Sequence, residues 1–168
     1  MFCGAVLARG RHLLDIYMVA FIGHRHVERF ACVEKQLQAV AESLIGSREY
    51  VVGFYMGRNG EFDIMAASAV RRAQRRLGAH NSCLILVLPY AVADMEDYLK
   101  FYQEVIIPFG GKAYPKAAIS KRNEWLVENC DLLVAYVTRG TGGAAAALKK
   151  AVRSGKSFCL LDRGDLPE

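Results

Sequence analysis

The sequence contains no Cys-x-x-Cys pair. Its five cysteines are an odd number and lie far apart in the chain, at Cys3, Cys32, Cys83, Cys130 and Cys159. Such spacing argues against a disulfide framework and against a zinc site. We therefore expect a protein of the reducing cytosol that requires no metal.

A segment that could cross a bilayer is also lacking. The apolar run 83–93 is shorter than a membrane span, and Pro89 interrupts it. Residues 1–23 mimic a signal peptide, but Asp15 lies inside their apolar stretch and no small-residue cleavage site follows. We expect neither a membrane partner nor an export signal.

Low complexity is absent as well. Hydrophobic residues make up 53% of the 168 residues and charged residues 23%, a composition that excludes a disordered chain. This length suits one domain, which we expect to span 1–168 with its core at about 16–162.

The net charge of +5 is mild, and much of the local excess lies in one segment. Arg71, Arg72, Arg75 and Arg76 share one face of an expected helix, where they would attract the phosphates of nucleic acid. No aromatic residue interleaves with them, so a solvated outer face is the favoured interpretation. Nucleic acid is therefore not the expected partner, and a single-stranded DNA-binding module is the third hypothesis for function.

Short apolar runs alternate with helical patterns along the chain. Continuous apolar runs suit strands that are buried on both faces, and the alternation predicts an α/β fold with a three-layer, Rossmann-like, doubly wound and mainly parallel sheet. The expected strands are 16–22, 50–56, 83–88, 132–137 and 157–161. The expected helices are 33–45, 62–77, 117–129 and 143–153. The less regular region 91–116 is expected to hold a short helix at 94–102 and a short strand at 104–107.

The strongest functional signal follows the expected strand 132–137. There Gly140-Thr141-Gly142-Gly143 leads into a helix that begins with four alanines. Glycines let a phosphate approach the backbone, and a helix N-terminus offers free amide groups and a partial positive charge. A phosphate-binding loop is the favoured interpretation, and a tight turn into a packed helix is the alternative.

Two other strand ends carry polar residues. Gly23-His24-Arg25 ends the first strand, where arginine can fork onto a phosphate and histidine can exchange a proton. Gly57 and Gly60 form a second glycine-rich entry into a helix. Ligands of such sheets bind beyond the carboxyl ends of the strands, so both loops are candidates.

Acidic residues open the helix after Gly60. Glu61 and Asp63 lie in its first turn, where such residues usually complement the helix dipole. For Asp63 a second interpretation has the same weight as this one: its carboxylate holds a ribose hydroxyl or orients Arg25.

The expected helix 117–129 presents two kinds of residue. Its polar members Lys121, Arg122 and Asn123 are candidates to point toward the ligand crevice. Its apolar stripe is expected in the core, with Trp125 also used for packing. That stripe consists of Ile119, Leu126, Val127 and Cys130.

Taken together, these motifs resemble the SLOG superfamily of Rossmann-like proteins over about 16–161. The motifs are Gly23-His24-Arg25, Gly57-x-x-Gly60-x-Phe62-Asp63, Arg122-Asn123 with Trp125, Asp131 and Gly142-Gly143. The superfamily includes the lonely-guy phosphoribohydrolases, the DNA-processing protein A fold and many bacterial proteins proposed to sense nucleotide-derived ligands. Domains of this kind often pair through helices, so a homodimer is a candidate assembly.

The resemblance implies roles for two of the motifs. Arg122-Asn123 would correspond to the basic pair of the lonely-guy enzymes, and Gly142-Gly143 to their P-G-G-x-G-T-x-x-E phosphate loop. Here Thr141 replaces the proline, and 144–150 contains no glutamate. The carboxylate that would assist N-glycosidic cleavage is therefore missing from its place.

The leading hypothesis is a sensor-like domain that binds a nucleotide or another phosphorylated small molecule, without a cofactor. The candidate ligand residues are Gly23, His24, Arg25, Gly57, Gly60, Asp63, Arg122, Asn123, Gly140, Thr141, Gly142 and Gly143. The second hypothesis is a nucleotide phosphoribohydrolase, in which Arg122 acts with a relocated carboxylate. The candidates for that carboxylate are Glu61, Asp63 and Glu124.

Overall fold

A computed structural model describes residues 16–110 and 115–161. Residue 162, where the expected core ends, lies outside these ranges. The elements in chain order are β1 (Ile16–Gly23), α1 (Phe30–Ser47), β2 (Val51–Met56), α2 (Glu61–Leu77), β3 (Ser82–Val87), α3 (Met95–Phe101), β4 (Glu104–Ile106), α4 (Pro115–Asn129), β5 (Leu132–Tyr136), α5 (Gly143–Arg153) and β6 (Ser157–Leu160).

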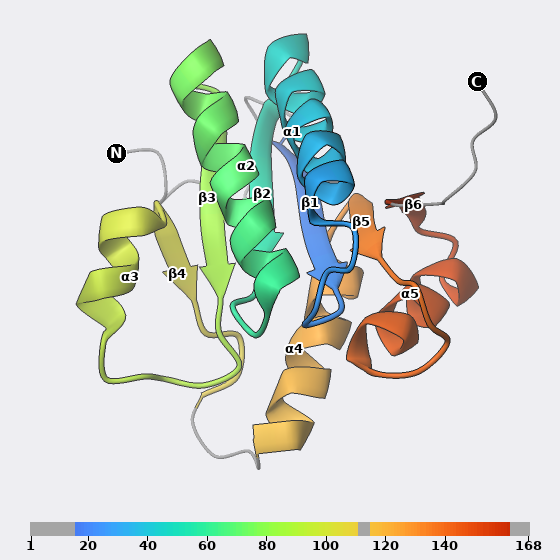
Figure 1. Ribbon diagram of the computed structural model, residues 1–168. Helices are drawn as coiled ribbons and strands as arrows, with labels where there is room; N and C mark the ends of the chain where they lie inside the picture. Colours follow the sequence, from blue (N-terminus) through green and yellow to red (C-terminus); the bar gives the residue numbers. More distant parts are fainter. Residues whose placement is uncertain (1–15, 111–114, 162–168) are drawn as a thin grey trace, which may run out of the picture.

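The strands form one sheet in the order β4-β3-β2-β1-β5-β6, and every pairing is parallel (Figure 1). From β1 the chain winds outward through β2 and β3 to β4. It then returns to the other side of β1 to add β5 and β6. The predicted doubly wound parallel sheet is thus confirmed, and the winding direction reverses between β1 and β5.

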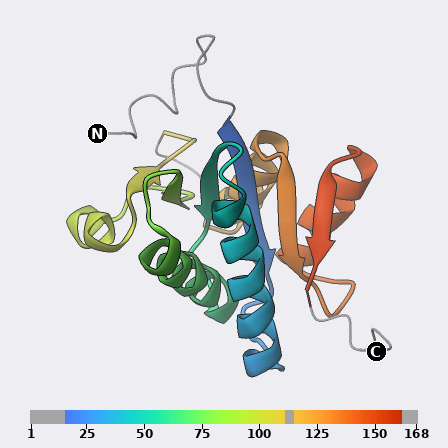
Figure 2. The same ribbon diagram turned by 90° about the horizontal axis from the view of Figure 1, so that it is seen from above.

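Alternating side chains of β1 show how the sheet separates two helical layers. Val19 and Phe21 belong to the core beneath α1 and α2, whereas Ala20 and Ile22 belong to the core on the α4 and α5 face. Figure 2 shows these helices on opposite sides of the sheet. Across 16–110 and 115–161, no helix combines the length and the apolar character that a bilayer span needs.

The element boundaries differ from the sequence prediction mainly at α1, which begins at Phe30 and not at Val33. Val33 is the first buried residue of this helix, while Phe30 is 52% exposed. The apolar periodicity therefore begins one turn after the helix itself. A pattern that detects burial misses a solvated first turn.

The arginine face of α2 is largely engaged within the fold. Arg72 lies 3.3 Å from the Glu34 carboxylate of α1, and Arg76 lies 3.0 Å from Glu42. The Arg71 guanidinium packs over the Phe101 ring at 4.8 Å. Three of the four arginines thus contact neighbouring elements, while Arg75 is exposed and the Arg76 side chain is still 71% exposed.

Candidate functional site

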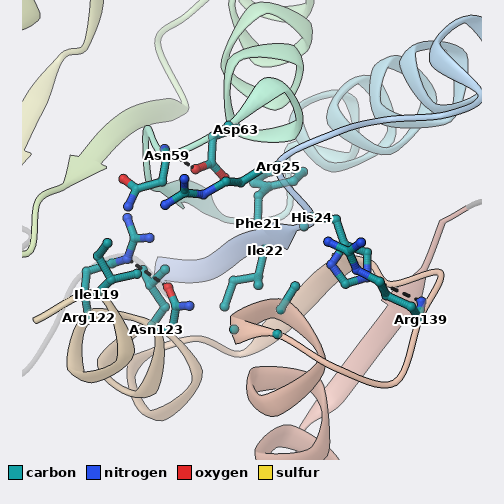
Figure 3. A pocket seen from close by; sticks show the side chains of 16 residues that line it. Phe21, Ile22, His24, Arg25, Asn59, Asp63, Ile119, Arg122, Asn123 and Arg139 are labelled. Atoms are coloured by element: carbon teal, nitrogen blue, oxygen red, sulfur yellow. Dashed lines mark hydrogen bonds between the residues drawn. The ribbon is translucent and has the colours of Figure 1, made fainter. Parts of the chain in front are cut away.

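A cavity of about 250 Å³ opens at the carboxyl ends of β1 and β5. This is the point where the winding of the sheet reverses, the usual ligand position in folds of this kind. The end of β1, the β2–α2 loop, α4 and the β5–α5 loop supply its walls (Figure 3).

The cavity brings together most of the predicted ligand residues. Those that line it are Gly23, His24, Arg25, Gly60, Asp63, Arg122, Asn123, Gly142 and Gly143. Gly57, Gly140 and Thr141 are not among its lining residues, and neither are Glu61, Lys121 and Glu124.

His24 connects β1 to the β5–α5 loop. Its amide donates to the Tyr136 carbonyl at 3.2 Å, and its Nε2 accepts from the Arg139 amide at 3.4 Å. Burial, together with the positive charge of Arg139, lowers the pKa of His24. A neutral ring that accepts at Nε2 carries its proton on Nδ1.

The β1–α1 loop is attached to the start of α2. The Glu61 amide donates to the Arg25 carbonyl at 2.8 Å, and the Glu61 carboxylate accepts from the Val27 amide at 2.9 Å. A Cβ atom at Gly60 would stand 2.5 Å from Arg25 Cα, so the two loops touch through their backbones. Glu61 therefore serves the loop and is not placed to act on a ligand in the cavity.

Glu124, another candidate carboxylate, also faces away from the cavity. It lies 3.8 Å from Lys150 of α5, and its side chain is 60% exposed. Asp63 is thus the one of the three candidate carboxylates that lines the cavity.

Asp63 is only 8% exposed, and its Oδ2 accepts from the Asn59 amide at 2.8 Å. Burial raises the pKa of this carboxyl, while the charge of Arg122 and the Asn59 hydrogen bond oppose that shift. Because burial dominates, Asp63 holds its proton more readily than an exposed aspartate does.

Arg122 is held in place at the base of the cavity. It is only 4% exposed, its Nη1 donates to the Val87 carbonyl at 3.2 Å, and its Nε donates to Asn123 Oδ1 at 3.0 Å. A Cβ atom at Gly57 would overlap the guanidinium, at 2.7 Å from Cζ. Gly57 thus contributes to the site by leaving room for Arg122. Burial lowers the pKa of Arg122, and Asp63 opposes this shift.

Asn123 is oriented by Arg122 and faces the start of α5. Since its Oδ1 accepts from Arg122, its Nδ2 is the donor that remains. This nitrogen lies 3.1 Å from the position of a Cβ atom on Gly143. Asn123 is 9% exposed, and Nδ2 has no hydrogen-bond partner among the residues that the structure describes. An unpartnered donor on a buried residue therefore lies beside the N-terminus of α5.

Several residues of the cavity escaped the sequence prediction. Arg139 follows β5 much as Arg25 follows β1, and Asn59 lies in the same glycine-rich loop as Gly60. Their positions at strand ends could have identified them. Ile119 was expected in the core and instead lines the cavity, because the stripe of α4 extends beyond the sheet edge.

In the two described ranges, no group of three or more histidine, cysteine, aspartate or glutamate side chains could hold a metal ion.

The sequence matches no protein-family model and no curated protein. Solved structures do resemble the fold. DNA processing protein A from Streptococcus pneumoniae has a TM-score of 0.64 and 16% identity, and the match covers 86% of this chain and 50% of that one. The chain thus spans about half the length of the pneumococcal protein.

Two further structures are similar. DNA processing protein A from Helicobacter pylori, described as having a unique single-stranded DNA binding mode, has a TM-score of 0.64 and 15% identity. The match covers 90% of this chain and 67% of that one. A structural genomics target, TM1055, has a TM-score of 0.54 and 13% identity, with 84% of this chain and 72% of that one covered. The chain therefore has a SLOG-like Rossmann fold.

Proposed function

We propose that the chain binds a nucleotide or another phosphorylated small molecule in the cavity between β1 and β5. The observation that carries this proposal is that the unpartnered Nδ2 of Asn123, a residue only 9% exposed, lies beside the α5 N-terminus. A helix N-terminus favours an anion because its first amide groups lack partners and the helix dipole is positive there. A second donor aimed at the same point makes the anion site specific.

The phosphate would lie against Gly142 and Gly143. The φ of Gly142 is +94°, a backbone conformation that glycine adopts readily. A side chain at Gly143 would press against Asn123 and would fill the space that the phosphate needs. Arg139 at the mouth adds positive charge.

The rest of the ligand would lie along an apolar wall formed by Ile22, Ile119 and Leu126. Asp63 and Asn59 supply polar groups that suit sugar hydroxyls. The cavity volume of about 250 Å³ is close to the lower end of small-molecule sites, which begin at about 300 Å³. A mononucleotide-sized ligand fits this scale better than a large cofactor does.

The second candidate function is cleavage of the N-glycosidic bond of a bound nucleotide. It is favoured by Asp63, a carboxyl in the cavity whose pKa burial raises, since a raised pKa makes a carboxyl a better candidate for a general acid. Single-stranded DNA binding, described for the Helicobacter pylori protein, is less favoured here because three of the four arginines on this face of α2 contact α1 or α3.

We place the protein in the cytosol on the basis of its cysteine pattern. The site would belong to a single domain.

Isothermal titration of the purified protein with adenosine 5′-monophosphate and with adenosine tests the proposal. We expect the phosphorylated compound to bind and adenosine to bind far more weakly, because adenosine lacks the group that α5 would hold. Other nucleoside monophosphates are to be compared in the same way. Analysis of the bound ligand for free base separates binding from hydrolysis.

Gly143→Asp places a carboxylate against Asn123 and should abolish binding. Gly140→Asp is the matched control, because it adds the same charge to the same loop at a position with open space and outside the cavity. Equal loss of binding in both variants, or absence of binding by every phosphorylated compound, would refute the proposal.

A further inference from the structure

We propose that His24 is a positioning residue for the β5–α5 loop, residues 137–142: its neutral ring holds the loop in place, and its protonated ring releases it. The loop leads into Gly142 and Gly143, against which the phosphate would lie. The consequence for a ligand therefore rests on the proposed function. We expect the affinity for a phosphorylated ligand to fall when His24 gains a proton.

The β5–α5 loop has few attachments to the rest of the fold. Residues 138–142 are exposed. Within 16–110 and 115–161, residues 138–141 form two hydrogen bonds. Lys149 Nζ of α5 donates to the Gly140 carbonyl at 3.1 Å, and the Arg139 amide donates to His24 Nε2 at 3.4 Å. Of these two bonds, only the second connects the loop to the end of β1.

The ring of His24 is itself held by β5. The residue is only 6% exposed, and its amide donates to the Tyr136 carbonyl at 3.2 Å. Its ring meets the Tyr136 ring edge-on, with 6.2 Å between the centroids, and Tyr136 in turn stacks on Phe62. Figure 3 shows His24 beside Arg139 at the cavity. Because its surroundings are buried and packed, the Nε2 atom gives the loop a fixed acceptor.

The bond to the loop depends on the protonation of His24. A ring nitrogen accepts a hydrogen bond only while it carries no proton, and both ring nitrogens are donors in the charged form. After protonation, the Nε2 proton would face the amide proton of Arg139. The positive charge of the ring would also be disfavoured by the charge of Arg139. The charged ring therefore cannot keep the hydrogen bond that the neutral ring makes.

The surroundings of His24 determine the pH at which this change occurs. Burial, followed by the charge of Arg139, lowers the pKa of His24 from its ordinary value of 6.5, while the Arg139 amide and Glu28 oppose the shift. The ring is thus neutral at neutral pH and gains its proton below pH 6.5. The other charged or titratable groups around this end of β1 and the cavity are Arg25, Glu28, Asp63, Arg122, Tyr136 and Arg139.

A direct contact between His24 and the phosphate would have the opposite effect. A charged ring that touched the phosphate would attract it, so affinity would rise as pH falls. A ring that positions the loop gives the reverse, because protonation releases the backbone that leads into the α5 N-terminus. The sign of the pH dependence therefore distinguishes the two roles.

Heteronuclear NMR of the imidazole ring and of the Arg139 amide tests the positioning role without a ligand. Histidines titrate between about pH 8 and about pH 5. We expect the neutral ring to carry its proton on Nδ1, and the Arg139 amide signal to shift with the same midpoint as the ring. In His24→Gln this shift should disappear, because glutamine offers an acceptor that does not titrate. An Arg139 amide that stays unchanged while the ring titrates would overturn the proposal.

Isothermal titration with adenosine 5′-monophosphate over the same pH range tests the consequence for binding. The phosphate of the ligand itself gains a proton at about pH 6, so wild type and variants are compared at each pH. On acidification the affinity of the wild type should fall by at least about fivefold more than that of His24→Gln, roughly the worth of one hydrogen bond. At about pH 8, His24→Leu should bind more weakly than His24→Gln, because leucine offers no acceptor.

His26→Gln is the matched control. It removes a histidine from the same β1–α1 loop, at a side chain that is 88% exposed and does not line the cavity. This variant should keep the pH dependence of the wild type.

The outcomes separate this inference from the proposed function. If the wild type and His24→Gln show the same pH dependence, or if acidification strengthens binding to the wild type relative to His24→Gln, His24 does not position the loop, while the proposed function stands. If no nucleoside monophosphate binds at any pH, the proposed function and the ligand part of this inference are both overturned. The NMR titration then decides alone whether His24 holds the loop.

Discussion

Replacing Gly57 by alanine tests whether Arg122 is locked in its position. The new Cβ atom would overlap the guanidinium, with Cζ at 2.7 Å and Nη2 at 2.8 Å. The φ of Gly57 is not positive, so alanine meets no backbone strain there. The side chain of Arg122 must therefore move, and its hydrogen bonds to the Val87 carbonyl and to Asn123 Oδ1 would be lost.

The expected loss of stability follows from these two bonds. Hydrogen bonds to charged groups contribute about 1.5–3 kcal/mol each. Alanine in place of glycine recovers about 0.4–1 kcal/mol by restricting the unfolded chain. The free energy of unfolding should fall by about 2–5 kcal/mol, and Tm by about 5–15 °C for a chain of this size.

Urea denaturation followed by fluorescence measures this change directly. Trp125 is the only tryptophan, lies on α4 with Arg122, and packs against Tyr55 at 5.2 Å between ring centroids. Gly140→Ala is the matched control, because no atom lies within 4 Å of its added Cβ and its φ is not positive. If both variants unfold at the same urea concentration, the guanidinium moves at no cost and the reasoning fails.

Three other variants probe the remaining contacts. Asp63→Asn should raise the free energy of unfolding at neutral pH. The raised pKa of Asp63 means that ionisation of this carboxyl is unfavourable in the folded protein. That cost disappears as pH falls toward the ordinary value of 3.8. Urea denaturation at neutral and acidic pH would contradict this reasoning if the stability gained by Asp63→Asn grew on acidification. Tyr136→Phe removes the 3.1 Å bond from the Glu28 amide and should lower stability by about 1 kcal/mol, with faster hydrogen exchange of that amide as the check. The double variant Arg72→Gln, Arg76→Gln should change stability only slightly, because both ion pairs are exposed to solvent. Fluorescence anisotropy with single-stranded DNA should show no change for this variant, and a large loss would restore the DNA-binding hypothesis.

The sheet could be predicted from the sequence because each strand is a short apolar run bounded by polar or glycine residues. In β3 every residue is buried, and in β2 all but the first are. Burial on both faces removes the alternation that a half-exposed strand would show. The short β4 and the seven-residue α3 were also placed, although α3 buries none of its residues fully.

The predicted strand ends indicated where the candidate site lies, but they did not indicate the role of each residue in it. Glu61 and Asp63 both open α2, yet one carboxylate supports the β1–α1 loop and the other lines the cavity. A helix turns by about 100° per residue, so two positions separate them widely. Which of the two faces the crevice depends on how α2 packs against β1, and sequence spacing does not contain that angle.

The position of Arg122 affects both the stability of the fold and the proposed binding of a ligand. Gly57 leaves space for it, Val87 and Asn123 accept its hydrogen bonds, and Asp63 opposes the effect of burial on its charge. Through Asn123 the same guanidinium fixes the donor that faces the α5 N-terminus. A change at Gly57 should therefore weaken a phosphate bound near Gly143, although Gly57 is not part of the cavity wall. Gly57, outside the cavity, would then limit affinity because it leaves Arg122 in its position. Arg122 in turn orients the side-chain amide of Asn123 through their hydrogen bond.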